Sequence, residues 1–290
     1  MFRGKVFGWA ALTCAVGTLL ATLAIALVLF GQSLPFFRHV QPSAFLLGRQ
    51  WRPTGAPPEY GLLPLLAGSL EITLGAALLS FPLGVLSAIF LQEHAGSRVR
   101  SVLRLPLELL AGVPAVVYGY LGLFLVTPML RSATPSFQAS NAASAAIVVA
   151  IMILPLIASV AQDAIAAVPE GLREGGYALG FTKTEVILRL VLPAARSGIF
   201  AALVLALSRA IGETIAVTLA AGSTAHLTLN PTKSMATMTS YILTTTQGDA
   251  EAGSMRYLSI FAVGLVLFVI TFTTNVIASR LRNSFKARLA

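Results

Sequence analysis

The sequence predicts an all-α polytopic membrane protein with six transmembrane helices. Of its 290 residues, 56% are hydrophobic and only 11% are charged, which is roughly half the charged fraction of a soluble domain. Six apolar runs are long enough to cross about 30 Å of hydrocarbon as helices of roughly 20 residues. These runs are continuous and do not alternate at every second residue, so they predict helices and not a β-barrel.

The first apolar run could be read as a cleaved signal peptide or as a retained membrane helix. It follows Arg3 and Lys5, as the apolar core of a signal peptide would, but it is far longer than about 7–15 residues and lacks a convincing cleavage site. We therefore expect a retained helix, in which the only cysteine, Cys14, cannot form an internal disulfide. The six predicted spans lie near Val6–Phe30, Leu62–Leu91, Leu105–Leu130, Ala142–Ala161, Ile199–Ala221 and Tyr257–Ala278.

The formal charge of +9 is unevenly distributed along the chain. If the N-terminus, loops 92–104 and 162–198 and the C-terminal tail share one side, that side holds 13 of the 20 Lys and Arg residues. The loops on the opposite side hold six. The positive-inside rule then places both termini in the cytoplasm, and the positive charge indicates topology and not nucleic-acid binding.

Residues 31–61 differ in composition from the rest, being rich in Pro, Gly and aromatic residues. We expect a loop or interfacial segment here, with Trp51 and Tyr60 in the lipid headgroup zone. A module boundary is predicted near residue 64. The predicted units are an N-terminal helix with an external loop (1–64), a five-helix transmembrane domain (65–280) and a cytoplasmic tail (281–290).

The longest predicted cytoplasmic loop contains the signals for two short helices. Pro169 suits a first helical position and Gly180 suits a helix end. Thr182 and Glu185 have the spacing of a capping box, which begins a second helix that we expect to end at Pro193. A helix–glycine–helix hairpin of this kind, projecting into the cytoplasm, predicts a docking element.

Two charges lie within an apolar run, in "LALSRAIGETIAVT" (Leu205–Thr218). An Arg or Glu at the centre of a membrane helix costs about 2.5–3.5 kcal/mol, so each requires a reason. Arg209 and Glu213 are four residues apart and are expected on one helix face, with the bare backbone of Gly212 between them. They could neutralise each other and pin the helix. We favour a polar pathway, because guanidinium matches the oxygens of phosphate bidentately.

The remaining polar residues give weaker signals. Glu71 and Glu108 are expected to be interfacial or paired with a cation, and neither the three histidines nor any other set has the spacing of a metal site or of a catalytic cluster. Gly175 and Gly180 have the spacing of P-loop glycines, but Phe181 and Thr182 follow in place of Lys and Ser/Thr. We therefore expect no enzyme activity, no metal, no cofactor and no ATP site in this chain.

The hairpin resembles the cytoplasmic loop of ABC importer permeases, whose pattern is Glu-Ala-Ala, three residues, Gly, nine residues and Ile-x-Leu-Pro. Four residues match that pattern at its spacing, and three depart from it. The matches are Glu174, Gly180, Leu192 and Pro193, while Gly175 and Gly176 replace the alanines and Leu190 replaces the isoleucine. The resemblance implies that residues 163–197 form the loop that couples the chain to an ATPase.

Longer segments over residues 62–280 resemble permeases of phosphate-specific transport systems, and "GETIAVTLAAG" followed by "MTSYI" resembles their C-type subunit. The resemblance implies a type I importer permease in the bacterial inner membrane. Its partners would be a second homologous permease, two ATPase subunits that bind ATP and Mg²⁺, and an external phosphate-binding protein. The substrate pathway would include Arg209, Gly212, Glu213 and Thr214.

Three alternatives remain open at this point. Sulfate and molybdate permeases also have an Arg-x-x-Gly-Glu core, but an aromatic residue usually follows it, whereas Thr214 follows here. A gradient-driven carrier would need no docking hairpin. A membrane-embedded enzyme is disfavoured by the lack of a catalytic cluster, and no residue of the chain indicates a signalling component. We therefore expect half of the channel of an ATP-driven phosphate importer.

Overall fold

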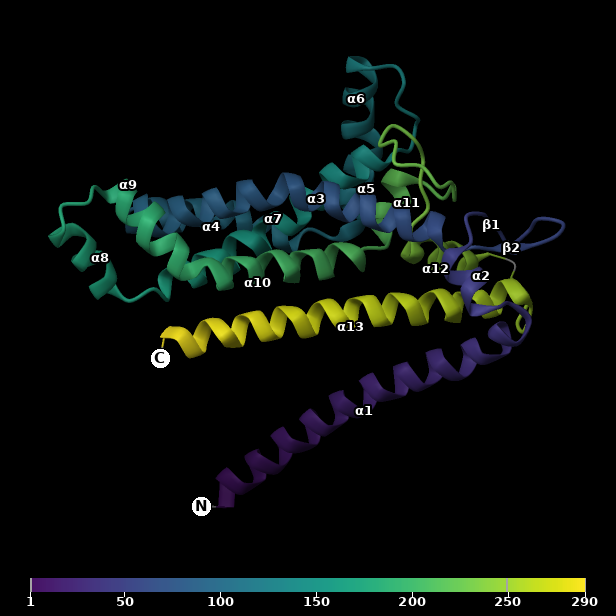
Figure 1. The fold of residues 1–290 in the computed structure, drawn as a ribbon, viewed down its shortest axis with the longest axis horizontal. Helices are drawn as coiled ribbons and strands as arrows, with labels where there is room; N and C mark the ends of the chain where they lie inside the picture. The colour runs from purple at the N-terminus through teal and green to yellow at the C-terminus, as the bar shows by residue number, and fades with distance from the viewer. Residues whose placement is uncertain (1, 249, 290) are drawn as a thin grey trace.

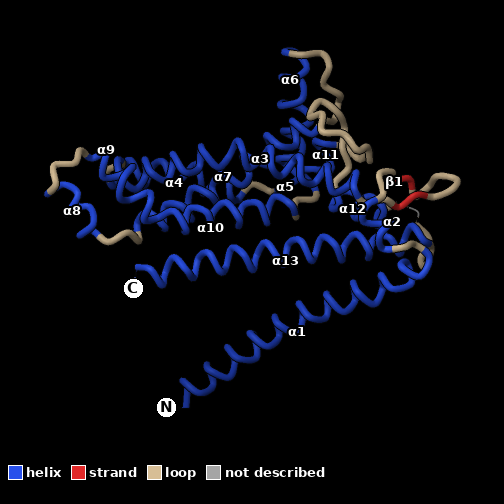
Figure 2. The backbone as a smooth tube through the Cα atoms, viewed as in Figure 1, coloured by secondary structure: helices blue, strands red, loops and turns tan. Residues whose placement is uncertain are grey.

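A computed structural model shows an elongated bundle of helices (Figures 1 and 2). It describes the backbone of residues 2–248 and 250–289 and the side chains of residues 7–9, 11–248 and 250–280. The first half of the chain forms α1 (Phe2–His39), α2 (Pro42–Leu47), β1 (Trp51–Arg52), β2 (Glu59–Tyr60), α3 (Leu63–Ile89), the π-helical turn η1 (Phe90–His94), α4 (Ser97–Gly112), α5 (Ala115–Leu121), η2 (Gly122–Val126) and α6 (Thr127–Ala133). The second half forms α7 (Ala142–Ala166), α8 (Glu170–Ala178), α9 (Lys183–Val186), η3 (Ile187–Val191), α10 (Leu192–Ile211), α11 (Ile215–Ala221), α12 (Met238–Gln247) and α13 (Met255–Leu289).

The prediction of six membrane-spanning helices is confirmed within the described chain. The six segments that are long and apolar enough are Phe7–His39, Leu63–His94, Ala115–Ala133, Ala142–Ala166, Lys183–Ile211 and Met255–Arg280. Figure 1 shows α8 and α9 at one end of the bundle, which we call the hairpin end. The N-terminal end of α1 and the C-terminal end of α13 lie on the same side. The opposite end, which we call the loop end, contains the β1–β2 hairpin, α2, α6, α11 and α12.

The core of the bundle is the packing of α3 against α7. Small residues allow these helices to approach closely: a Cβ added to Gly84 would lie 2.7 Å from the Cγ2 of Ile157, and one added to Gly75 would lie 3.1 Å from the Cβ of Ala146. Without a hydrophobic driving force in lipid, such van der Waals contact is what holds membrane helices together. Ile153 and Ile157 of α7 are fully buried in this core.

The third span differs from its prediction as one helix over Leu105–Leu130. The helix is interrupted at Val113 and Pro114, so α4 is a separate helix and the span begins at Ala115. Proline disfavours the helical conformation in the residue before it, and Val113 is extended, with φ −69° and ψ 129°. None of the residues of α4 is buried in the chain.

Trp51 and Tyr60, which we expected in the headgroup zone, are buried within the protein and do not present their rings to lipid. They are 5% and 8% exposed and belong to a buried aromatic cluster at the loop end, with Phe36 and Phe45. The rings of Phe36 and Tyr60 meet edge-to-face at 5.3 Å between centroids, a geometry that aromatic pairs prefer. This packing also explains why α1 continues beyond its predicted end to His39.

The second helix of the predicted hairpin does not end at Pro193. It continues through η3 into α10 as one membrane-spanning segment, Lys183–Ile211. Pro193 is the second residue of α10, inside this continuous segment, where a proline removes one i→i−4 hydrogen bond. The preceding π turn, η3, changes the hydrogen-bond pattern just before the proline.

Candidate functional site

The candidate substrate site lies where α10 and α11 are interrupted. The sequence predicts a continuous helix over Ile199–Ala221, but α10 ends at Ile211 and α11 begins at Ile215. Gly212 ends α10 and the next two residues form the connection. The placement of Arg209 and Glu213 on one face of one helix is therefore wrong, because the helix ends between them.

Glu213 serves the start of α11. One of its carboxylate oxygens accepts a hydrogen bond from the backbone N–H of Ala216 at 3.3 Å, which satisfies one of the free donors at a helix N-terminus. Its backbone carbonyl accepts a hydrogen bond from the Thr239 hydroxyl of α12 at 2.8 Å. Thr214 adds a local bond by donating from its hydroxyl to the carbonyl of Gly212. Glu213 and Thr214 thus fix the interruption and tie it to α12.

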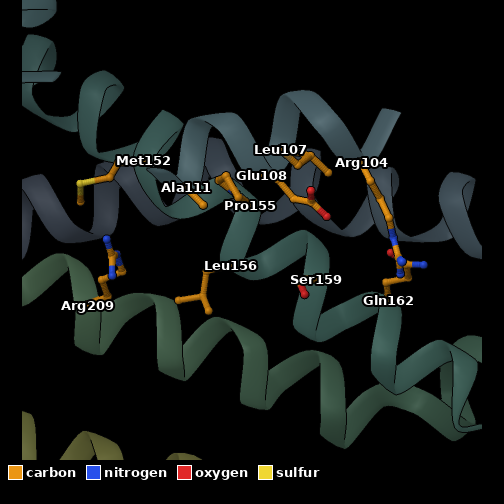
Figure 3. A pocket seen from close by; sticks show the side chains of 10 residues that line it. All are labelled: Arg104, Leu107, Glu108, Ala111, Met152, Pro155, Leu156, Ser159, Gln162 and Arg209. Carbon is orange, nitrogen blue, oxygen red and sulfur yellow. The ribbon is translucent and has the colours of Figure 1, made fainter. Parts of the chain in front are cut away.

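Arg209 is an exposed guanidinium in the last turn of α10, with no ion-pair partner among the described residues. It lines a cavity of about 460 Å³ between α4, α7 and α10 (Figure 3). The other lining residues are Arg104, Leu107, Glu108, Ala111, Met152, Pro155, Leu156, Ser159 and Gln162. In Figure 3, Arg209 and Met152 lie at one end of the cavity, and Arg104 and Gln162 lie at the other.

The charges of this cavity suit an anion. Two arginines, Arg104 and Arg209, and one carboxylate, Glu108, line it, so its formal charge is positive. A cleft with a net positive charge and apolar walls attracts anions. Ser159 and Gln162 of α7 add neutral hydrogen-bonding groups along the cavity. The arrangement can hold an oxyanion by hydrogen bonds and charge, without any covalent chemistry.

The sequence analysis missed the contribution of α4. Arg104 and Glu108 have i,i+4 spacing in "RLPLELL", but the predicted boundary at Leu105 separates them: Arg104 falls in the loop 92–104, and Glu108 falls in the span, with an interfacial or pairing role. Glu71, the other weak signal, lies in α3, and its carboxylate oxygens have no hydrogen-bond partner among the described residues. It does not line the cavity.

The hairpin at the other candidate site forms as its sequence signals predict. Gly180 follows α8 with φ +83°, a left-handed conformation that glycine adopts without steric cost. The capping box is present: the hydroxyl of Thr182 accepts from the N–H of Glu185, and the Glu185 carboxylate accepts from the N–H of Thr182 at 3.0 Å. The expected helix–glycine–helix hairpin is confirmed.

The residues of the coupling pattern divide into a packed set and an exposed set. Gly176 is buried. A Cβ added to it would lie only 2.6 Å from the Cδ1 of Leu190 and 2.9 Å from the Cγ2 of Val186. The glycine that replaces the second alanine therefore lets α8 pack closely on η3. Leu192 is half-buried, whereas Glu174, Gly175, Gly180 and Pro193 are exposed.

A buried cation fastens this hairpin to the bundle, and the sequence analysis did not identify it. Arg173 of α8 is 7% exposed and donates to the carbonyls of Val168 at 2.6 Å and Ile165 at 3.0 Å. It also donates to the carboxylates of Glu93 at 3.0 Å and Glu170 at 3.3 Å. Four acceptors satisfy most of the five donors of a guanidinium.

Six apolar spans, an interrupted helix beside a charged cavity and a helical hairpin at one end describe a multi-pass membrane protein with a polar site. The comparisons give its family. Residues 80–287 match the family of binding-protein-dependent transport system inner membrane components. The chain belongs to this family, and it is therefore the permease component of an ABC transporter and a multi-pass protein of the bacterial inner membrane.

Relatives with curated names agree with this family. The chain is 38% identical to "Probable ABC transporter permease protein YqgH" of Bacillus subtilis, over 89% of this chain and 84% of that protein. It is 34% identical to "Phosphate transport system permease protein PstC" of Mesorhizobium japonicum, over 84% of this chain and 80% of that protein. It is 32% identical to the PstC protein of Haemophilus influenzae, over 93% and 90% of the two chains.

Solved structures support the fold alone. A chain of a bacterial alginate ABC transporter, solved in complex with a periplasmic protein, matches with a TM-score of 0.64 at 15% identity, over 97% of this chain and 96% of that chain. A chain of the MetNI methionine ABC transporter in an inward-facing conformation matches with a TM-score of 0.55 at 15% identity, over 76% and 95% of the two chains. The expected importer permease fold is confirmed.

Proposed function

We propose that this chain is the permease subunit of an ATP-driven inorganic phosphate importer and forms half of the translocation pathway. The observation that supports it most is Arg209, whose guanidinium has no ion pair within the described part of the chain and lines a positively charged cavity at a helix interruption. A planar guanidinium donates two parallel hydrogen bonds to a phosphate, and such charge-assisted bonds are about twice as strong as neutral ones. The relatives named as phosphate permeases favour the same cargo.

We assign the other subunits of the transporter to the two ends of the bundle. We place the hairpin end in the cytoplasm, in agreement with the distribution of Lys and Arg, and there Glu174, Gly175, Gly180 and Pro193 are free to contact an ATPase. Two ATPase subunits would bind ATP and Mg²⁺, and a second homologous permease would complete the pathway. An external phosphate-binding protein would deliver the cargo at the loop end.

The experiment is ATP-dependent uptake of labelled phosphate by the assembled complex in proteoliposomes, with sulfate and molybdate as competitors. We expect uptake that requires ATP and is displaced by unlabelled phosphate but not by a tenfold excess of the other two anions. Displacement by sulfate or molybdate at equal concentration would assign a different oxyanion. Uptake by this chain alone, without ATP, would reject coupling to an ATPase.

A further inference from the structure

A second cavity, at the loop end, is lined by an unusual share of the positive charge on that side of the molecule. It has a volume of about 640 Å³ and is formed by the segment around β1, the loop after α11, α12 and the first turn of α13. Three arginines line it, Arg49, Arg52 and Arg256, together with His226. The three arginines are half of the six Lys and Arg residues in the loops opposite the predicted cytoplasmic side. The positive charge of these loops is therefore concentrated at one place.

None of this charge is neutralised within the described residues. Among the described residues that line the cavity, none is Asp or Glu, and none of the three arginines has an ion pair. The nearest acidic residue along the strands is Glu59, which is opposite Arg52 in the β1–β2 register without pairing with it. Burial raises the pKa of the Tyr241 phenol, so that this lining residue also stays neutral.

Two of the residues that line the cavity, Trp51 and Arg256, also carry buried donors without acceptors. The Nε of Arg256 and the Nε1 of Trp51 are both buried and have no hydrogen-bond partner among the described residues. A buried donor without an acceptor costs about 1–3 kcal/mol, so each such group needs an explanation. The hydroxyl groups of Ser223, Thr224 and Thr244 line the same cavity. Cations and hydroxyls without a carboxylate are the chemistry of an oxyanion site.

We propose that this cavity is a second oxyanion site, separate from the one at Arg209, which receives inorganic phosphate at the loop end before the phosphate enters the pathway. The site itself is argued from its own residues, and only the choice of phosphate rests on the proposed function. The two sites are physically linked through α12. Tyr241 and Thr244 of that helix line the cavity, and Thr239, at its start, holds the carbonyl of Glu213 at the helix interruption.

The test is equilibrium binding of labelled phosphate to the purified full chain in phospholipid-free detergent, without ATP, so that transport is not needed. We expect saturable binding that falls at least tenfold in affinity in Arg256→Gln and in Arg52→Gln. Arg52 is exposed on a short strand, so its variant keeps the test valid if Arg256→Gln does not fold. The matched control is Arg38→Gln, which removes the same charge from an exposed position in the last turn of α1 outside the cavity.

Arg209→Gln separates this inference from the proposed function. If the cavity is a distinct site, this variant keeps phosphate binding that remains sensitive to Arg52→Gln, even where transport by the assembled complex is lost. Equal affinities in the Arg52, Arg256 and Arg38 variants would show general charge attraction only and would overturn the inference. So would loss of all phosphate binding in Arg209→Gln, or the absence of saturable binding to the unaltered chain.

Discussion

The guanidinium of Arg173 in α8 lies 3.0 Å from the carboxylate of Glu93 in η1, and the two side chains are only 9% and 10% exposed. Since η1 continues α3, this ion pair joins the hairpin directly to a helix of the transmembrane core. The same arginine binds two carbonyls near the end of α7. This one side chain therefore gives the hairpin a polar connection to both α3 and α7.

The first prediction concerns this link. Arg173→Gln leaves Glu93 buried without its cation, and breaking a buried pair costs roughly 3–5 kcal/mol. We expect the assembled complex to hydrolyse ATP with little phosphate transported per ATP. The control is Arg189→Gln in the same hairpin, because its pair with Glu185 is longer, at 3.6 Å, and exposed, and such pairs contribute only about 0–1 kcal/mol. An unchanged ratio of transport to hydrolysis in Arg173→Gln would refute the role of the link.

A second prediction compares two glycines of the hairpin. Gly180→Ala forces a residue with a Cβ to adopt φ +83°, which costs roughly 1–2 kcal/mol. Gly175→Ala places its Cβ where no atom lies within 4 Å and gains about 0.8–1.0 kcal/mol of helix propensity. We expect faster proteolysis of the hairpin in the first variant and equal or slower proteolysis in the second. The same rate in both would contradict the left-handed turn.

The third prediction distinguishes the two roles considered for Glu213. If its carboxylate caps α11, Glu213→Gln keeps an acceptor for the N–H of Ala216 and retains most of the stability. Glu213→Ala loses that acceptor, at a cost of about 0.5–2 kcal/mol, by analogy with other N-terminal caps. Thermal unfolding of the purified chain measures the difference. If Gln and Ala are equally harmful, the negative charge matters and the paired interpretation regains support.

Features that depend on neighbouring residues are the ones that the sequence predicts best. Apolar runs define the six spans, and the signals of the hairpin, namely Gly180, Thr182 and Glu185, act locally, so their geometry follows from neighbouring residues. The interruptions at Pro114 and Gly212 were harder to predict, because both lie in runs whose hydropathy continues across the break. Hydropathy measures transfer into lipid and does not detect where a helix ends within it.

The site was only partly predictable for a related reason. Arg209 stands out as a charge in an apolar run, whereas Arg104 and Glu108 reach the cavity only because α4 folds beside α7 and α10. Contacts between residues far apart in sequence, such as Arg173 with Glu93, require the tertiary fold. Trp51 and Tyr60, whose residue types suit a membrane interface, pack in a buried aromatic cluster that only the tertiary fold reveals.

The central claim is that the guanidinium of Arg209 binds the transported anion. Phosphate uptake by the reconstituted complex tests this claim most directly. We predict that Arg209→Gln lowers uptake about tenfold or more, because a hydrogen bond to a charged group contributes roughly 1.5–3 kcal/mol, and that Arg209→Lys restores only part of it by supplying charge without the planar fork. Assembly is checked in both variants, and Arg196→Gln, an exposed arginine in the same helix, is the control. Uptake by Arg209→Gln at the rate of that control would contradict the account.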